Sequence, residues 1–120
     1  MVGQRPDEER HGWPGRVAVA LTRDDPPRVF IAESDAVLSR VVALRLVART
    51  APRDLVEPRL LADIRRALLE ERWSDAVFLW MDATGEVVDA YPDEEVWSTR
   101  HLDEERASME VRIAPLFEDP

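Results

Sequence analysis

The sequence predicts a single α+β domain in which a small antiparallel sheet is packed by three to four helices. Three observations predict this class. Two short β-branched runs near the N-terminus read as strands, later segments repeat apolar residues at helical spacing, and a length of 120 residues suits one hydrophobic core. Residues 1–15 are expected to be a flexible lead-in, and residues 16–120 to form the domain.

Residues 16–22 and 28–33 are predicted to pair as an N-terminal hairpin. Their sequences, RVAVALT and RVFIAE, are separated by a short stretch that holds two aspartates and two prolines, which favour a turn. In the first strand the two valines and the leucine share one face and the two alanines share the other. This alternation indicates a sheet with one covered face.

Two helices are predicted after the hairpin. Ser34 is an N-cap candidate for a helix over 35–50, whose apolar residues occupy most of the circumference, so this helix is expected to be largely buried. Pro58 fits the first turn of a second helix that reaches Arg72. The second helix has the clearest apolar stripe in the chain, formed by Leu60, Leu61, Ile64, Ala67 and Leu68.

The apolar stripe changes face at the end of the second predicted helix. With roughly 100° of rotation per residue, Trp73 and Trp80 fall on the side opposite to Ile64. A straight helix cannot bury both stripes in one core. A break is therefore required near residues 73–74.

The segment 75–83 allows two structures. One is a helix with Ser74 as its N-cap and Gly85 just after its last residue, and this assignment is favoured. The other is a buried strand followed by a turn. In either case residues 86–91, with the sequence EVVDAY, are expected to form a strand.

The C-terminal residues have the weakest structural pattern. Residues 92–101 are expected to be irregular or weakly extended. Helical spacing of apolar residues then favours a helix over about 102–113, although Met109, Val111 and Ile113 also alternate as a strand would.

Composition excludes several kinds of chemistry. The chain has no cysteine, and all sixteen of its basic residues are arginine. Disulfides, thiolate nucleophiles, cysteine metal sites and lysine Schiff bases are therefore excluded. The absence of lysine and asparagine is typical of a protein from a high-GC bacterial genome. No apolar run approaches the roughly 20 residues of a membrane span, and no signal peptide is recognisable, so we expect a cytoplasmic protein without a membrane partner.

No catalytic motif is found. The serines lie outside any G-x-S-x-G turn, and the four glycines form no phosphate-binding loop. We therefore expect a protein that is not an enzyme and has no cofactor or metal. The competing hypothesis is a metal-assisted enzyme around His101, with ligands drawn from the neighbouring acids Asp93, Glu94, Asp103 and Glu105.

Charge is distributed unevenly along the chain. Of the net charge of −9, residues 86–120 carry −8, from eleven acids and three arginines. Residues 40–72 hold eight arginines and five acids, for a local charge of +3. An acidic segment speeds association with a basic partner. The expected function is therefore a small protein–protein interaction or regulatory module with an acidic C-terminal contact surface.

Six residues are candidate partner contacts. Trp97 is the strongest, because tryptophan is enriched at interface hot spots and Trp97 lies in an acidic stretch. Arg45 interrupts the apolar pattern of the first predicted helix. It is expected to extend its charge into water along an apolar stem, to pair with a C-terminal acid, or to face a groove for a carboxylate or phosphate. The remaining candidates are His101, Asp93, Glu94 and Glu95.

Two kinds of protein partner remain open. One is a protein with a basic surface, and the other is a second copy of this chain whose residues 40–72 meet the acidic segment. Nucleic acid is not expected, since the net charge opposes phosphate and the sequence DAVFLWMDA offers no side chain that reads bases. A nucleic-acid-associated helical module remains an alternative, and it would use Arg59, Arg65, Arg66 and Arg72.

Overall fold

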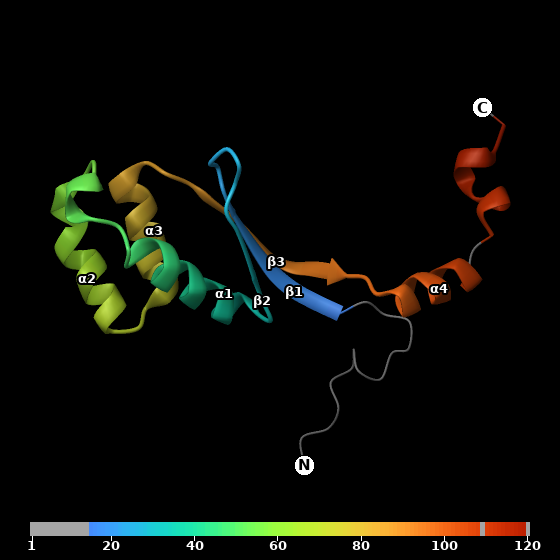
Figure 1. Ribbon diagram of the computed structural model, residues 1–120, viewed down its shortest axis with the longest axis horizontal. Coiled ribbons are helices and arrows are strands. Elements are labelled where there is room, and N and C mark those ends of the chain that lie inside the picture. The colour runs from blue at the N-terminus through green and yellow to red at the C-terminus, as the bar shows by residue number, and fades with distance from the viewer. Residues whose placement is uncertain (1–14, 109, 120) are drawn as a thin grey trace, which may run out of the picture. The chain divides into compact units, whose positions relative to one another are not determined.

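The computed structural model describes residues 15–108 and 110–119 (Figure 1). The expected flexible lead-in lies outside these residues, except for Gly15. The described residues divide into two units, a 17–94 unit and a terminal unit that contains residues 15–16, 95–108 and 110–119. The helices and strands, in chain order, are β1 (Gly15–Thr22), β2 (Val29–Ala32), α1 (Asp35–Val42), α2 (Leu61–Leu69), α3 (Trp73–Thr84), β3 (Val88–Val96) and α4 (Thr99–Ser108).

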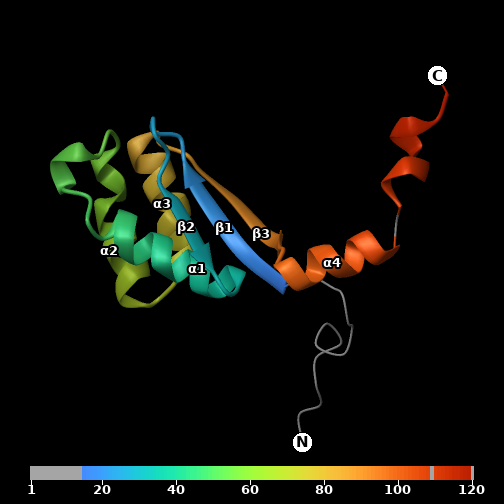
Figure 2. The ribbon, with the colours of Figure 1, turned by 45° about the vertical axis from the view of Figure 1, so that its right-hand side comes forward.

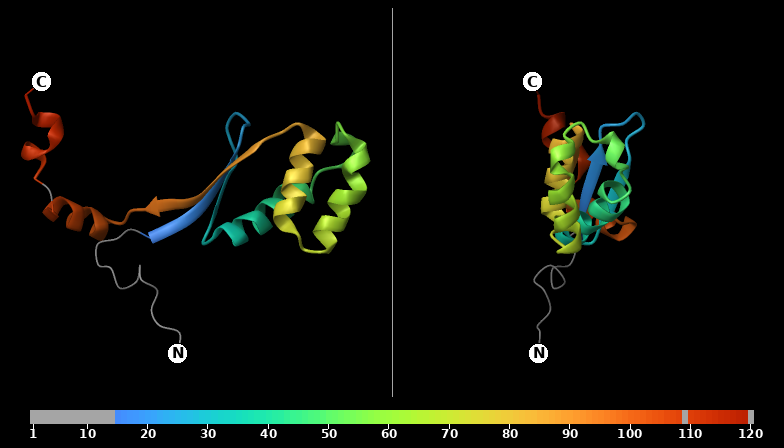
Figure 3. Two further views of the ribbon diagram at one scale, coloured as in Figure 1. Left: turned by 180° about the vertical axis from the view of Figure 1, so that it is seen from behind. Right: turned by 90° about the vertical axis from the view of Figure 1, so that its left-hand side faces the viewer.

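The three strands form one small antiparallel sheet in the order β2-β1-β3, and with four helices this confirms the predicted α+β class. The predicted hairpin is present, with Ala18 opposite Ala32 and Leu21 opposite Val29. Helices α1, α2 and α3 lie together at one side of the sheet (Figure 2; Figure 3 gives the view from behind).

The helices cover the alanine face of β1. Ala18 and Ala20 are fully buried in the core cluster, whereas the valines of the other face are only partly buried. Small side chains let a helix approach the sheet closely, and the larger side chains then remain on the open face. That open face leaves Val29 and Ile31 of β2 exposed.

Helix α1 begins as predicted at Ser34, whose side-chain oxygen accepts a hydrogen bond of 3.2 Å from the backbone N–H of Val37. It runs into a π-helical turn at Ala43–Val47. The expectation that this helix is largely buried is wrong, since it packs on one side only. Its buried residues are Leu38, Val42, Ala43, Leu46 and Val47, whereas Val37 and Leu44 are exposed.

The predicted break between the second and third helices is confirmed. Helix α2 follows a short 3₁₀ turn (Pro58–Leu60), and α3 begins at Trp73 after Glu71, whose φ is +57°. Ser74 therefore lies inside the first turn and is not the N-cap. Gly85 caps the C-terminus of α3 in the left-handed conformation, at φ +77°, as predicted. The helical assignment of this segment is correct, and the strand alternative is wrong.

Tryptophan contributes to the core through α3. Trp80 is 3% exposed and belongs to the core cluster with Leu38, Val42 and Ile64. Trp73 is half-buried, with the guanidinium carbon of Arg40 5.6 Å from its ring centre.

The C-terminal boundaries differ from those predicted. Residues 92–96 are part of β3, which contains Pro92; an edge strand tolerates proline because its outer N–H groups need no partner in the sheet. Helix α4 starts at Thr99 and ends at Ser108, and Val111–Ile113 forms a 3₁₀ turn rather than a strand. Within residues 15–108 and 110–119, no helix is long and apolar enough to cross a membrane.

Candidate functional site

The start of α4 is built from Ser98 and His101. The Ser98 hydroxyl oxygen accepts a hydrogen bond of 3.3 Å from the backbone N–H of His101, and the backbone N–H of Ser98 donates to the His101 Nδ1 atom at 3.4 Å. This reciprocal pair resembles a capping box in which a histidine takes the place of the usual glutamate. His101 therefore fixes the position at which the helix begins.

Trp97 and Glu95 adjoin this cap. The Trp97 indole N–H donates to the Glu95 Oε2 atom at 2.9 Å, and the Trp97 ring meets the His101 ring edge-on, with ring centres 6.5 Å apart. Glu95 also pairs with Arg16 at 3.3 Å. Three of the six candidate contacts thus form one cluster. The roles of Arg16 and Ser98 were not predicted, because they depend on where β3 ends and α4 begins.

The other two acidic candidates lie on β3. Asp93 and Glu94 are exposed, and successive residues of a strand point to opposite faces of the sheet. Asp93 and Glu94 therefore point to opposite faces of the strand.

The residues after Ser98 expose large apolar side chains. Helix α4 has no buried residue, although it contains Leu102. Leu116 is 88% exposed, and the other exposed large apolar residues here are Leu102, Val111, Ile113 and Phe117. Acids are interspersed among them along the chain. The segment therefore combines negative charge with uncovered apolar surface.

The donor set for a metal around His101 is incomplete. In the part of the chain that the structure describes, no group of three or more histidines and carboxylates lies close enough to hold a metal ion. The Nδ1 atom of His101 is also engaged with Ser98. Neither observation favours the metal-assisted alternative.

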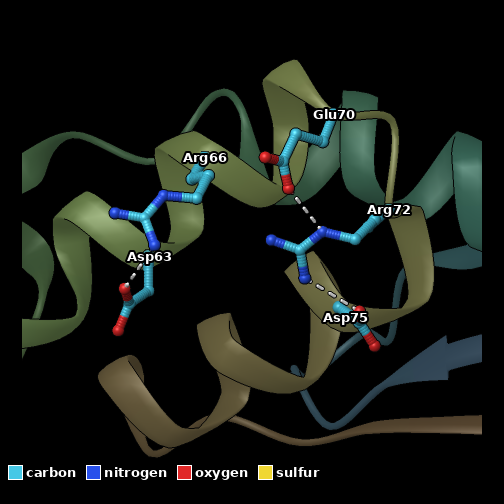
Figure 4. A network of polar contacts seen from close by, with 5 residues as sticks. All are labelled: Asp63, Arg66, Glu70, Arg72 and Asp75. Carbon is cyan, nitrogen blue, oxygen red and sulfur yellow. Dashed lines mark hydrogen bonds and ion pairs between the residues drawn. The ribbon is translucent and has the colours of Figure 1, made fainter.

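The arginines proposed for nucleic-acid contact are largely paired with acids. Arg72 hydrogen-bonds Glu70 at 2.8 Å and Asp75 at 2.9 Å, and Arg66 lies 4.0 Å from Asp63 (Figure 4). The hydrogen bonds that Arg72 donates to Asp75 and Glu70 raise the pKa of Arg72 above its ordinary value. Arg59 pairs with Glu57, which leaves Arg65 as the one member of the set without an ion pair to a described residue.

Arg45 lies in the 17–94 unit, in the wall of a cavity of about 670 Å³. It is exposed and makes no ion pair with any residue that the structure describes. Its exposed position on the cavity wall suits both an arginine that extends its charge into water and an arginine that faces a groove.

Comparison of the chain with protein-family models, with curated proteins and with solved structures finds no match.

Proposed function

We propose that this chain is a small, cytoplasmic, non-catalytic interaction module that binds a protein with a basic surface through its acidic segment, residues 86–120. The observation that carries the proposal is the combination of exposed apolar side chains with a charge of −8 in the same stretch of sequence. Large exposed apolar surface is characteristic of interaction sites in soluble proteins.

The two features of the acidic segment contribute different parts of binding. The carboxylates attract a basic protein over a distance and raise the association rate, an effect that salt weakens. Apolar anchors such as Trp97 and Phe117 contribute affinity when the partner buries them. Trp97 is 43% exposed, so much of its ring is accessible to a partner.

A second copy of the chain is the alternative partner, and the arginines of residues 40–72 favour it. Four of the eight make neither an ion pair nor a cation–π contact with a described residue: Arg45, Arg49, Arg53 and Arg65. Light scattering during size-exclusion chromatography at low and at moderate salt tests this version. A dimer that dissociates with salt supports it, and a monomer under both conditions contradicts it.

The interaction itself is tested by affinity capture from the lysate of the native host. Wild-type protein is compared with a Trp97→Ala/Phe117→Ser double variant and with a Val56→Ser control, which alters an exposed apolar residue of the 17–94 unit. We expect a basic protein that is retained at low salt, is reduced at moderate salt, and is lost with the double variant only. Equal capture by all three proteins would contradict the proposed surface.

A further inference from the structure

The cavity that contains Arg45 is formed by parts of the chain that are distant in sequence but belong to the 17–94 unit. Its walls come from the β1–β2 turn, from the end of the first helix, and from the C-terminus of α3 with the residues after it. Its volume of about 670 Å³ lies within the range of small-molecule sites in proteins.

Four arginines line the cavity, and three of them make no ion pair with a described residue. Arg23 is held by Asp89 through two hydrogen bonds of 3.0 Å. Arg28, Arg45 and Arg49 make no ion pair with any residue of the described ranges. Three arginines from two separate parts of the chain therefore line one cavity: Arg28 comes from the β1–β2 turn, and Arg45 and Arg49 come from the end of the first helix and the residues after it.

Three carboxylates line the same cavity: Asp24, Asp54 and Glu86. Asp24 accepts a hydrogen bond of 2.9 Å from the Thr22 hydroxyl. Asp54 and Glu86 have no side-chain partner among the described residues and form no ion pair with the arginines. The cavity lining thus contains both arginines and carboxylates that make no ion pair with a described residue, a combination that suits a ligand carrying both an anionic group and hydrogen-bond donors.

A π-helical turn forms part of the wall. The backbone N–H of Ala48 donates to the carbonyl of Ala43 at 2.9 Å, the five-residue spacing of a π-helix. Such turns are rare and occur frequently at functional sites. Here the turn includes Arg45 and Leu46 of the cavity wall, and Arg49 lies two residues after its end.

The buried side of the cavity is held rigidly by hydrogen bonds. The Trp80 indole N–H donates to the Thr50 hydroxyl oxygen at 2.8 Å, and that hydroxyl donates to the Leu46 carbonyl at 2.8 Å. The Thr84 hydroxyl donates to the Trp80 carbonyl and accepts from the backbone N–H of Glu86. A fixed wall reduces the entropy lost when a ligand binds.

We propose that this cavity binds a small hydroxylated or aminated ligand whose phosphate or carboxylate is held by Arg28, Arg45 and Arg49. Its hydroxyl or amino groups donate to Asp54 and Glu86. A guanidinium holds either anion through paired, charge-assisted hydrogen bonds. The proposal does not depend on the acidic segment, and it stands or falls separately from the interaction function.

The test follows the indole N–H signals of ¹⁵N-labelled full-length protein by NMR at constant ionic strength. The probes are ribose 5-phosphate, gluconate and uncharged ribose, which separate phosphate, carboxylate and hydroxyl recognition. The Trp80 signal reports on the cavity, while Trp73 and Trp97 lie outside its lining and serve as internal controls. We expect a saturable shift of Trp80 with one of the two anionic probes and none with ribose.

The Arg45→Gln/Arg49→Gln double variant should weaken that binding at least tenfold. Both side chains are exposed, and Arg28→Gln provides a second test from a different element. Arg65→Gln is the matched control for Arg28→Gln, since each removes one positive charge from an exposed position, that of Arg65 being on α2. The absence of a saturable shift with both anions would overturn the proposal. Equal weakening by Arg65→Gln would also overturn it, because it would indicate nonspecific charge attraction.

Discussion

Trp80 joins α3 to the residues that follow the first helix through its hydrogen bond to the Thr50 hydroxyl. Because Trp80 is 3% exposed, its N–H has little access to water if this acceptor is removed. A buried donor without a partner costs about 1–3 kcal/mol. Thr50→Val is therefore expected to lower the free energy of unfolding by about that amount, as measured by urea denaturation.

Trp97→Phe is the matched control for this prediction. It removes an indole N–H whose hydrogen bond to Glu95 is exposed to solvent, so water replaces the lost partner. Its effect on the unfolding free energy should be small. If Thr50→Val destabilises no more than Trp97→Phe, the hydrogen bond at Trp80 does not have the proposed role.

Arg23 and Asp89 give the fold a defined dependence on pH. The hydrogen bonds from Arg23 lower the pKa of Asp89, and the positive charge of Arg23 lowers it further. A lowered pKa in the folded state stabilises the protein above the ordinary value of about pH 4, and this contribution is lost as the pH falls through the lowered pKa. Asp89→Asn should therefore lose less stability than the wild type between neutral and acidic pH.

Urea denaturation at several pH values down to about pH 2.5 checks this prediction. Arg23→Gln removes the cause of the lowered Asp89 pKa. Like Asp89→Asn, it should make the free energy of unfolding depend less on pH. A wild-type pH profile in both variants would show that the pair does not couple folding to protonation.

At the scale of elements, α3 is bounded by two residues with left-handed backbone, Glu71 before it and Gly85 after it. This conformation costs a residue with a side chain about 1–2 kcal/mol, whereas glycine adopts it freely. Glu71→Gly should therefore raise the unfolding free energy by up to about 1 kcal/mol, and Gly85→Ala should lower it by about 1 kcal/mol. Thermal and urea denaturation of both variants test whether Glu71→Gly stabilises the protein while Gly85→Ala destabilises it. Stability changes of the same sign in both variants would contradict the argument.

The boundaries of α3 also show which features the sequence could predict. The break before it follows from the change of apolar face, because Ile64 and Trp80 cannot be buried in one core along a straight helix. Its first residue could not be predicted from capping preference, since Arg72 holds the turn through ion pairs with Glu70 and Asp75 instead of a Ser74 cap.

The outer half of β3 was expected only as irregular or weakly extended chain, for a related reason. It is polar and exposed, so it has no apolar alternation, and only pairing with β1 identifies it as a strand. The cavity was also beyond prediction, because residues from several separate segments meet there. Arg45 alone could be suspected, from its position in an apolar stretch.

At the scale of the whole molecule, the hydrophobic core and the acidic segment occupy different parts of the sequence. Every residue of the core cluster lies between Ala18 and Ala83, and the partly buried residues packed against it extend only to Val88. Helix α4 and the two 3₁₀ turns after it contribute no buried residue among those described. Stability and the proposed interaction should therefore be separable by truncation.

A chain that ends at Ser98 tests this separation. It keeps the three strands and helices α1–α3, so it should unfold in one cooperative transition, with a free energy within about 1 kcal/mol of the full chain. It should retain the Trp80 indole shift with the anionic probe, but should capture no basic partner, because Phe117 and most of the apolar surface are gone. Loss of cooperative unfolding would show that the C-terminal residues are required by the fold, which would leave less reason to assign their exposed apolar side chains to a partner.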